Sequence, residues 1–235
     1  MNSIKPKIIN IHGIDVVYLK REGALTSYIG FQSLSGSFAE RPEEYGIAHF
    51  LEHMFFNGTE KRNWEQIGED GALLSGIQNA YTSHYNTSYY ISSFPYSNLD
   101  GALELLSDMM FNSNFPEEKM ERERSVIQEE RKEYDDDHSS HYFHKLMADR
   151  FNGQMNHDII GTEETIGNIS RDDLIGYKKR MYGKENTILL VVSPLEEDAV
   201  LDICRKYLKY NTLDNICVPL VEEDLLINNE KDIFK

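Results

Sequence analysis

The sequence predicts an α+β fold in which a largely antiparallel β-sheet has helices packed on one face. Segments with alternating apolar and polar residues, many of them β-branched or aromatic, predict strands at 7–11, 14–19, 27–34, 77–82, 87–94 and 187–192. Apolar residues at helical spacing predict helices between several of these strands. A turn at His12 and Gly13 joins the first two strands, as is typical of an antiparallel hairpin.

The helices are predicted from their apolar spacing and from residues that start and stop helices. One is expected to begin at Pro42, with two glutamates after it, and to stop at Asn57 and Gly58. A short helix is capped by Asn63, with Gln66 three residues later, and another by Ser170. The predicted helical ranges are 42–56, a short helix from 63, 99–110, 116–135, 138–151, 170–182 and 196–208, with a loop at 153–162.

The chain has 235 residues and 40% hydrophobic content, which predicts one folded domain over 1–210 and a tail or linker over 211–235. Its formal charge of −16 disfavours nucleic acid and anionic membranes as partners and favours basic peptides, although an acidic surface that only keeps the protein in solution explains the charge equally well. The first residues lack the apolar core of a signal peptide, and no apolar run is long enough to span a bilayer, so we expect a cytoplasmic protein. Cys204 and Cys217 are expected to be free thiols.

A metal-binding pattern lies in the predicted helix at 42–56. His49 and His53 are four residues apart and share one face, so both imidazoles can bind one metal ion. Glu52 projects beside them and can take a proton from a metal-activated water. The rest of the segment is apolar, so the histidines are buried and need partners. The motif alone is equally consistent with two hydrogen-bonded core histidines.

A catalytic zinc site needs a third protein ligand and an open fourth position. Candidates lie in the helix after Pro116, where Glu123 and Glu130 are seven residues apart and share a face two turns apart. One could bind metal while the other steadies a ligand imidazole. The same charged helix is also consistent with a solvated surface, and periodicity does not single out these two glutamates.

Several stretches, in this order, resemble the pitrilysin family of metallopeptidases, which includes insulysin and the mitochondrial processing peptidase. They are GIAHFLEHMFFNGT at 46–59, NAYT at 79–82, TSYY at 87–90, ERSVIQEE at 123–130, IIGTEETI at 159–166 and the strand at 186–192. The resemblance extends over about 8–208. It implies that 1–210 is a single catalytic domain of the N-terminal type, with the inverted HxxEH zinc motif and the family's α+β fold.

The resemblance also implies roles for individual residues. His49, His53 and Glu130 correspond to the zinc ligands, Glu52 to the general base, and Glu123 to a supporting catalytic carboxylate near the metal. The family's spacing selects Glu130, because 76 residues separate it from His53.

In the family, the substrate peptide adds as a strand beside the segment that corresponds to Asn79, Ala80 and Tyr81. These positions could equally be ordinary residues of an edge strand. The loop at 154–158 departs from the family's Pro-Leu-Gly-Arg run and has His157 where an arginine is expected.

The resemblance further implies an assembly, because family members have at least two such domains. The second half would come from a homodimer, a separate partner chain or a longer precursor, with a partner chain favoured. The predicted function is a zinc-dependent endopeptidase for short or unfolded, basic peptides. The alternatives are a non-catalytic subunit or scaffold and a structural zinc site; Glu52 argues against the latter, since a closed site has no use for a base.

Overall fold

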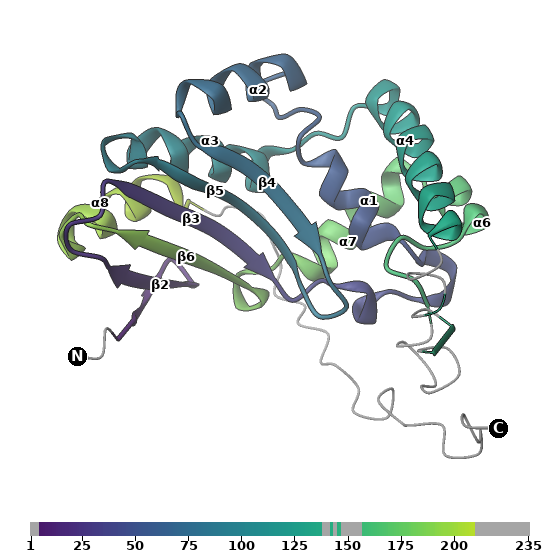
Figure 1. Cartoon of the computed structure of the whole chain (residues 1–235), viewed down its shortest axis with the longest axis horizontal. Helices are drawn as coiled ribbons and strands as arrows, with labels where there is room; N and C mark the ends of the chain where they lie inside the picture. Colours follow the sequence, from purple (N-terminus) through teal and green to yellow (C-terminus); the bar gives the residue numbers. More distant parts are fainter. Residues whose placement is uncertain (1–4, 138–141, 143–144, 147–156, 210–235) are drawn as a thin grey trace.

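The computed structural model describes residues 5–137, 142, 145–146 and 157–209 (Figure 1). Most of the helix predicted at 138–151 lies outside the described residues. The same is true of the tail predicted at 211–235, which includes Cys217. It is also true of most of the loop at 154–158, where the sequence differs from the family pattern.

A six-stranded sheet forms the centre of the fold, with strand order β1-β2-β6-β3-β5-β4. The pair β2 and β6 is parallel and the other neighbouring pairs are antiparallel, so the predicted largely antiparallel sheet is confirmed. The strands are β1 (Lys7–Ile11), β2 (Ile14–Lys20), β3 (Thr26–Ser33), β4 (Ile77–Thr82), β5 (Thr87–Pro95) and β6 (Thr187–Ser193).

Helices cover one face of this sheet, as predicted, and Figure 1 shows α3 and α8 behind the strands and α1 and α7 beyond the ends of β3 and β5. Side chains alternate between the faces: Ile29 and Phe31 of β3 are fully buried in the core, whereas Tyr28 and Gln32 lie on the opposite face. The helices are α1 (Ile47–Met54), α2 (Trp64–Leu73), α3 (Leu99–Asn112), α4 (Glu117–Asp136), α6 (Glu163–Asn168), α7 (Arg171–Met181) and α8 (Glu197–Tyr207). Short 3-10 turns lie at Ser37–Ala39, Pro42–Glu44, Tyr96–Asn98 and Lys184–Asn186.

The prediction of one continuous helix over 42–56 is wrong. The structure has a 3-10 turn at Pro42–Glu44, a break at Gly46, and then α1. Gly46 has φ +93°, which an L side chain rarely adopts, and an added Cβ would lie 2.5 Å from the carbonyl oxygen of Ile160. The break is stabilised by buried Glu40, whose carboxylate accepts hydrogen bonds from the backbone N–H groups of Gly46 and Ala48 at 2.9 and 2.8 Å.

The predicted caps at Asn63 and Ser170 are confirmed. Asn63 exchanges hydrogen bonds with Gln66 at 2.9 Å in both directions, and Ser170 caps α7 in the same manner with Asp173. Helix α6, which sequence patterning did not predict, starts at a similar box in which the side chain of Thr162 accepts from the backbone of Thr165.

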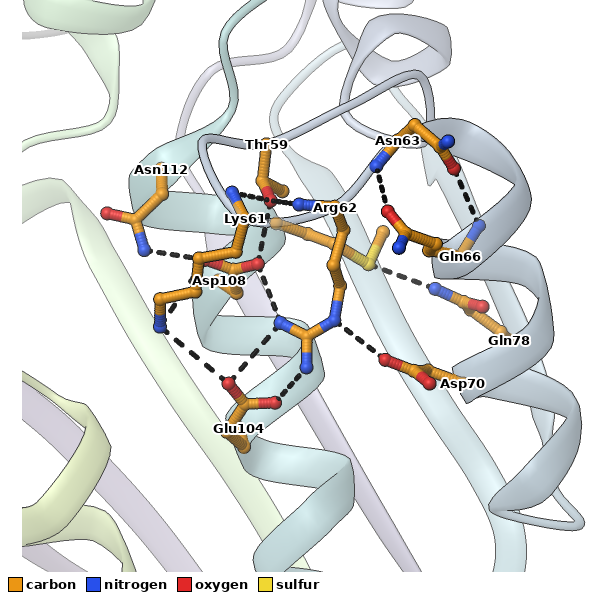
Figure 2. A network of polar contacts seen from close by, with 11 residues as sticks. Thr59, Lys61, Arg62, Asn63, Gln66, Asp70, Gln78, Glu104, Asp108 and Asn112 are labelled. Atoms are coloured by element: carbon orange, nitrogen blue, oxygen red, sulfur yellow. Dashed lines mark hydrogen bonds and ion pairs between the residues drawn. The ribbon is translucent and has the colours of Figure 1, made fainter.

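A polar network holds the loop between α1 and α2 against α3 (Figure 2). The guanidinium of Arg62 bonds Glu104, Asp108 and Asp70 at 2.5, 2.7 and 2.8 Å. Thr59 donates to the buried carboxylate of Asp108 at 2.8 Å. The network therefore anchors the loop that follows α1 to α2 and α3.

Candidate metal centre

Helix α1 presents its polar residues on one side because its apolar residues occupy the other. The buried set is Ile47, Ala48, Phe50, Leu51 and Met54, each with 0% exposure. The remaining positions are His49, Glu52 and His53, which the i, i+3, i+4 spacing brings to one face. The segment is therefore an amphipathic helix whose polar stripe lies within the protein.

Helix α4 brings two glutamates to this stripe. Met120 and Ile127 are its buried residues, and α4 packs against α1. Glu123 and Glu130 each follow one of these anchors by three positions, so they share the inward side of the helix. Glu129, one residue away from Glu130, is exposed. Packing thus separates two neighbouring glutamates that the sequence alone leaves equivalent.

His49, His53 and Glu130 form a trio that could hold a metal ion, and they are the one such group found among the described residues. Their donor atoms all lie within 4.8 Å of one another; Oε2 of Glu130 is 3.8 Å from Nε2 of His49 and 3.6 Å from Nε2 of His53. Tetrahedral ligands at zinc distances of about 2.0–2.1 Å lie about 3.3–3.4 Å apart. The two distances to Glu130 would have to shorten by only a few tenths of an ångström to reach this spacing.

His53 is held by hydrogen bonds to its ring and to its backbone. Its Nδ1 atom lies 3.1 Å from Oε2 of Glu123, and Asn57 donates to its backbone carbonyl at 2.9 Å. The hydrogen bond with His53 lowers the pKa of Glu123. An ionised Glu123 accepts the Nδ1 proton and leaves Nε2, the atom facing Glu130, free to bind metal.

The pKa values of the two histidines are shifted in opposite directions. Burial, with a smaller contribution from the charge of His53, lowers the pKa of His49 to about 3, so its imidazole is neutral at pH 7. Its buried Nδ1 atom has no hydrogen-bond partner among the described residues. Burial acts in the same direction on His53, but the hydrogen bond with Glu123 and the charges of Glu52 and Glu130 outweigh it and raise the pKa. A neutral imidazole is the form that binds a metal.

Glu52 lies beside the trio and is held by β4. Thr82, the last residue of that strand, donates a hydrogen bond to Oε2 of Glu52 at 2.6 Å. Burial and the charge of Glu130 raise the pKa of Glu52, although Thr82 and His53 act in the opposite direction. Burial likewise raises the pKa of Glu130. Three carboxylates around two imidazoles make a site whose negative charge a divalent cation would balance.

The predicted substrate residues lie on the edge strand β4, beside α1. Asn79 and Tyr81 are exposed on the face of the sheet opposite the core, while Ala80 packs partly against the core. Oδ1 of Asn79 accepts the backbone N–H of Ala80 at 2.9 Å. Thr82, the next residue of the strand, contacts Glu52, and none of these three residues belongs to the metal trio itself.

Sequence reasoning missed three residues that support the site: Thr82, Asn57 and Glu40. Thr82 follows Tyr81 and its inward orientation is implied by strand alternation, so the period of β4 contained the signal. Glu40 comes from a distant loop, and its carboxylate is also 3.1 Å from Nε2 of His157, whose ring stacks on Tyr45 at 3.7 Å. The resemblance leads us to expect an arginine at the position of His157. In this chain, His157 pairs with Glu40, whose carboxylate accepts the backbone N–H groups at the start of α1.

Comparison with known proteins identifies the class. The family model described as insulinase, peptidase family M16, matches residues 15–163. The chain therefore belongs to the insulinase family, and the resemblance inferred from its motifs is confirmed.

Relatives with curated names are zinc proteases and processing peptidases. The chain is 32% identical over 194 residues to an uncharacterized zinc protease, YmxG, of Bacillus subtilis, covering 82% of this chain and 47% of that protein. It is 34% identical over 196 residues to the mitochondrial-processing peptidase subunit beta of Homo sapiens, covering 83% of this chain and 39% of that protein. These names associate the family with zinc and proteolysis.

Among solved structures, a protease from Helicobacter pylori superposes with a TM-score of 0.85 at 25% identity, over 92% of this chain and 53% of that one. A domain described as an inactive peptidase M16 domain from Pseudomonas fluorescens has the same fold, with a TM-score of 0.80 at 14% identity. The chain thus spans about half the length of the curated relatives and solved chains that it matches. Among the described helices, none has the length and apolar character needed to cross a membrane.

Proposed function

We propose that this chain is the metal-bearing half of a zinc-dependent endopeptidase. The observation that carries the proposal is the convergence of His49, His53 and Glu130 within 4.8 Å, with Glu52 beside them. Two neutral or neutralisable imidazoles and one carboxylate make a three-ligand set that leaves a fourth position open, as a catalytic zinc site requires. The family and the names of the relatives support zinc as the metal.

Each side chain has a defined role in the proposed reaction. Zinc, when bound by the trio, supplies a Lewis acid that polarises the scissile carbonyl and makes a nearby water more acidic. Glu52 accepts the proton of the attacking water and delivers it to the amine leaving group. Its raised pKa suits both halves of that transfer. Glu123 holds His53 in the tautomer that exposes Nε2.

The substrate in this proposal is a short or unfolded peptide that adds to the sheet edge at β4, alongside Asn79, Ala80 and Tyr81. β4 is an edge strand, and on its outer side it has no strand partner among the described residues. A peptide bound there by backbone hydrogen bonds would be held beside α1. The net charge of −16 favours basic peptides.

The proposed enzyme is completed by a second half. The chain spans less than half of these curated relatives, and several relatives are named as subunits. A partner chain, a second copy of this chain or a further part of a longer protein would close the substrate chamber. We propose a cytoplasmic location, with 1–210 as the catalytic domain and 211–235 as a tail or linker.

The test is made on the tagged chain expressed in its own cells, so that any partner is purified with it. Zinc content and cleavage of a quenched basic peptide are measured for the wild type and for Glu52→Gln. We expect about one zinc per site in both proteins and a fall in kcat of at least a hundredfold in the variant, because a general base contributes about 10²–10⁴-fold. Glu129→Gln is the matched control, because this exposed glutamate lies on α4 outside the site.

The outcomes separate the alternatives. Zinc with no cleavage that depends on Glu52 would identify a non-catalytic subunit or a structural site. Cleavage that persists without zinc would overturn the proposal.

A further inference from the structure

The hydroxyl of Thr82 contacts the base of the proposed reaction. Its Oγ1 atom lies 2.6 Å from Oε2 of Glu52, a short distance typical of an O–H donor and an ionised carboxylate. The two residues are 30 positions apart in sequence, one at the end of the edge strand and one on the metal helix. This is the one described hydrogen bond that joins a side chain of β4 to a side chain of α1.

Thr82 is the donor in this hydrogen bond, because an ionised carboxylate can only accept, and the neighbouring hydroxyl of Thr87 does not compete for its proton. A threonine hydroxyl has a single proton to donate. Thr87 has a backbone acceptor for its proton, the carbonyl oxygen of Ser35 at 3.3 Å. The proton of Thr82 then has two acceptors, Thr87 at 3.5 Å and Glu52 at 2.6 Å, and the nearer, charged oxygen is the better one.

The contact limits what Glu52 can do. With one acceptor position of Oε2 engaged, Oε1 is the less occupied oxygen for accepting a proton, and the contact ties the carboxylate to the end of the strand. Thr82 also follows directly after the three residues proposed to bind the peptide, so its hydrogen bond links the base on α1 to the strand beside which the substrate would bind. A displacement of about 1 Å between a base and its substrate can cost about a hundredfold in rate.

We propose that Thr82 is a positioning residue that fixes the general base Glu52 relative to the peptide-binding edge of β4. The inference rests on the proposed peptidase function. It differs from a purely structural role, in which the hydroxyl only satisfies a half-buried carboxylate. A structural role predicts a loss of stability when the hydroxyl is removed, whereas positioning predicts a loss of kcat with KM retained.

The variants are chosen to separate the hydroxyl from the volume of the side chain. Thr82→Val keeps the branched shape and removes the donor, and Thr82→Ser keeps the donor and removes a methyl group. Thr26→Val, at an exposed position of β3, is the matched control for a threonine-to-valine change in a strand. All are made in the tagged chain with any partner it retains, and kcat, KM, zinc content and melting temperature are measured with the same peptide.

We expect Thr82→Val to lower kcat by about tenfold to a hundredfold, with KM changed by less than about threefold and zinc content unchanged. Thr82→Ser should retain kcat within about fivefold, and Thr26→Val should match the wild type. Since Thr82 acts through Glu52, adding Thr82→Val to Glu52→Gln should cause little further loss.

Three results would overturn the inference. They are an unchanged kcat in Thr82→Val, an equal loss in the serine and valine variants, and full additivity with Glu52→Gln. Each leaves the peptidase proposal standing, because wild-type cleavage and its dependence on Glu52 would remain. An inactive wild type would instead remove the proposed function and this inference with it.

Discussion

Nδ1 of His53 lies 3.1 Å from Oε2 of Glu123, and this hydrogen bond joins α1 to α4 within the proposed metal centre. Both side chains are mostly buried, with exposures of 22% and 17%. An interaction of this kind orients a ligand ring and increases its basicity before any metal arrives. Its energetic contribution should therefore appear in zinc affinity more than in folding.

Glu123→Gln tests this contribution. The amide keeps the size of the side chain but loses the charge that holds the Nδ1 proton, so we expect zinc affinity to fall by about 10–100-fold. Competition with a chromogenic chelator measures the affinity. Raising the concentration of free zinc should restore cleavage by Glu123→Gln. It should not restore cleavage by Glu52→Gln, which lacks the general base. Glu118→Gln, on the exposed side of α4, is the control, and equal affinities in the two variants would contradict the assignment.

The distinction between Glu129 and Glu130 shows what the sequence could supply. Spacing alone left the glutamates of α4 equivalent, and only family resemblance selected Glu130. The structure gives a physical reason: Met120 and Ile127 are the buried anchors of the helix, and Glu123 and Glu130 follow each by three positions. These two apolar residues in a charged helix indicate which side of α4 is buried. The indication is too weak to use without knowing that α4 packs against α1.

Removal of zinc should destabilise the protein. Without a cation, the carboxylates of Glu52, Glu123 and Glu130 surround two imidazoles with excess negative charge, and ligand binding stabilises the folded state by about 4 kcal/mol at a thousandfold excess over Kd. We expect dialysis against a chelator to lower the melting temperature by roughly 10 °C, with recovery on adding zinc. Glu130→Gln should reduce this zinc dependence. A melting temperature insensitive to chelator would exclude a tightly bound ion.

Glu40→Gln should weaken both the fold and the site. Both carboxylate oxygens of Glu40 accept backbone N–H groups at the start of α1, and an amide would place an N–H donor against one of them. We expect a loss of about 2 kcal/mol in stability, because a buried polar group would lose its acceptor, and weaker zinc binding as α1 shifts. Urea unfolding and zinc titration measure the two effects. Glu43→Gln in the preceding turn, where the side chain is exposed, serves as the control.

The start of α1 also shows where patterning fails. A proline followed by two glutamates favours a helix start, and the apolar spacing continues to Phe56, so a single helix over 42–56 was a reasonable prediction. The break at Gly46 depends on Glu40 and on the approach of Gly161. Both are tertiary contacts, which local propensity does not contain.

Arg62→Met should destabilise the loop after α1. Its guanidinium forms ion pairs with three carboxylates, among them Asp108, whose side chain is 1% exposed (Figure 2). Leaving that buried charge without its nearest cation should cost about 2–3 kcal/mol and lower the melting temperature by roughly 5–10 °C. Arg205→Met, which breaks an exposed pair with Asp202, is the control and should change stability by less than about 0.5 kcal/mol. Equal effects of the two substitutions would contradict the structural role of Arg62.

Lys178 gives the stability of the protein a pH dependence of its own. The side chain is buried, and its Nζ atom donates to Oγ of Ser113 at 2.7 Å and lies 5.2 Å from the ring centre of Phe55. Burial lowers the pKa of Lys178 from 10.5 to about 7, with the charge of Glu60 acting in the opposite direction. Between pH 7 and pH 10.5, the amine of Lys178 is protonated in the unfolded chain and neutral in the folded chain. The free energy of unfolding should therefore rise with pH by up to about 1.4 kcal/mol per unit from pH 7 upward.

The comparison with Lys178→Met isolates this effect, because methionine keeps most of the side-chain volume and cannot titrate. Urea unfolding at pH 7, 8 and 9 should show wild type gaining stability relative to the variant at each step, since the proton that Lys178 must lose on folding becomes easier to remove as the pH rises. Lys179→Met, at an exposed neighbouring position, should give a pH dependence parallel to that of the wild type. If the Lys178→Met curve also runs parallel to the wild type, the amine is charged throughout this range, and the ring faces of Phe55 and Phe115 and the Ser113 hydroxyl solvate it better than burial implies.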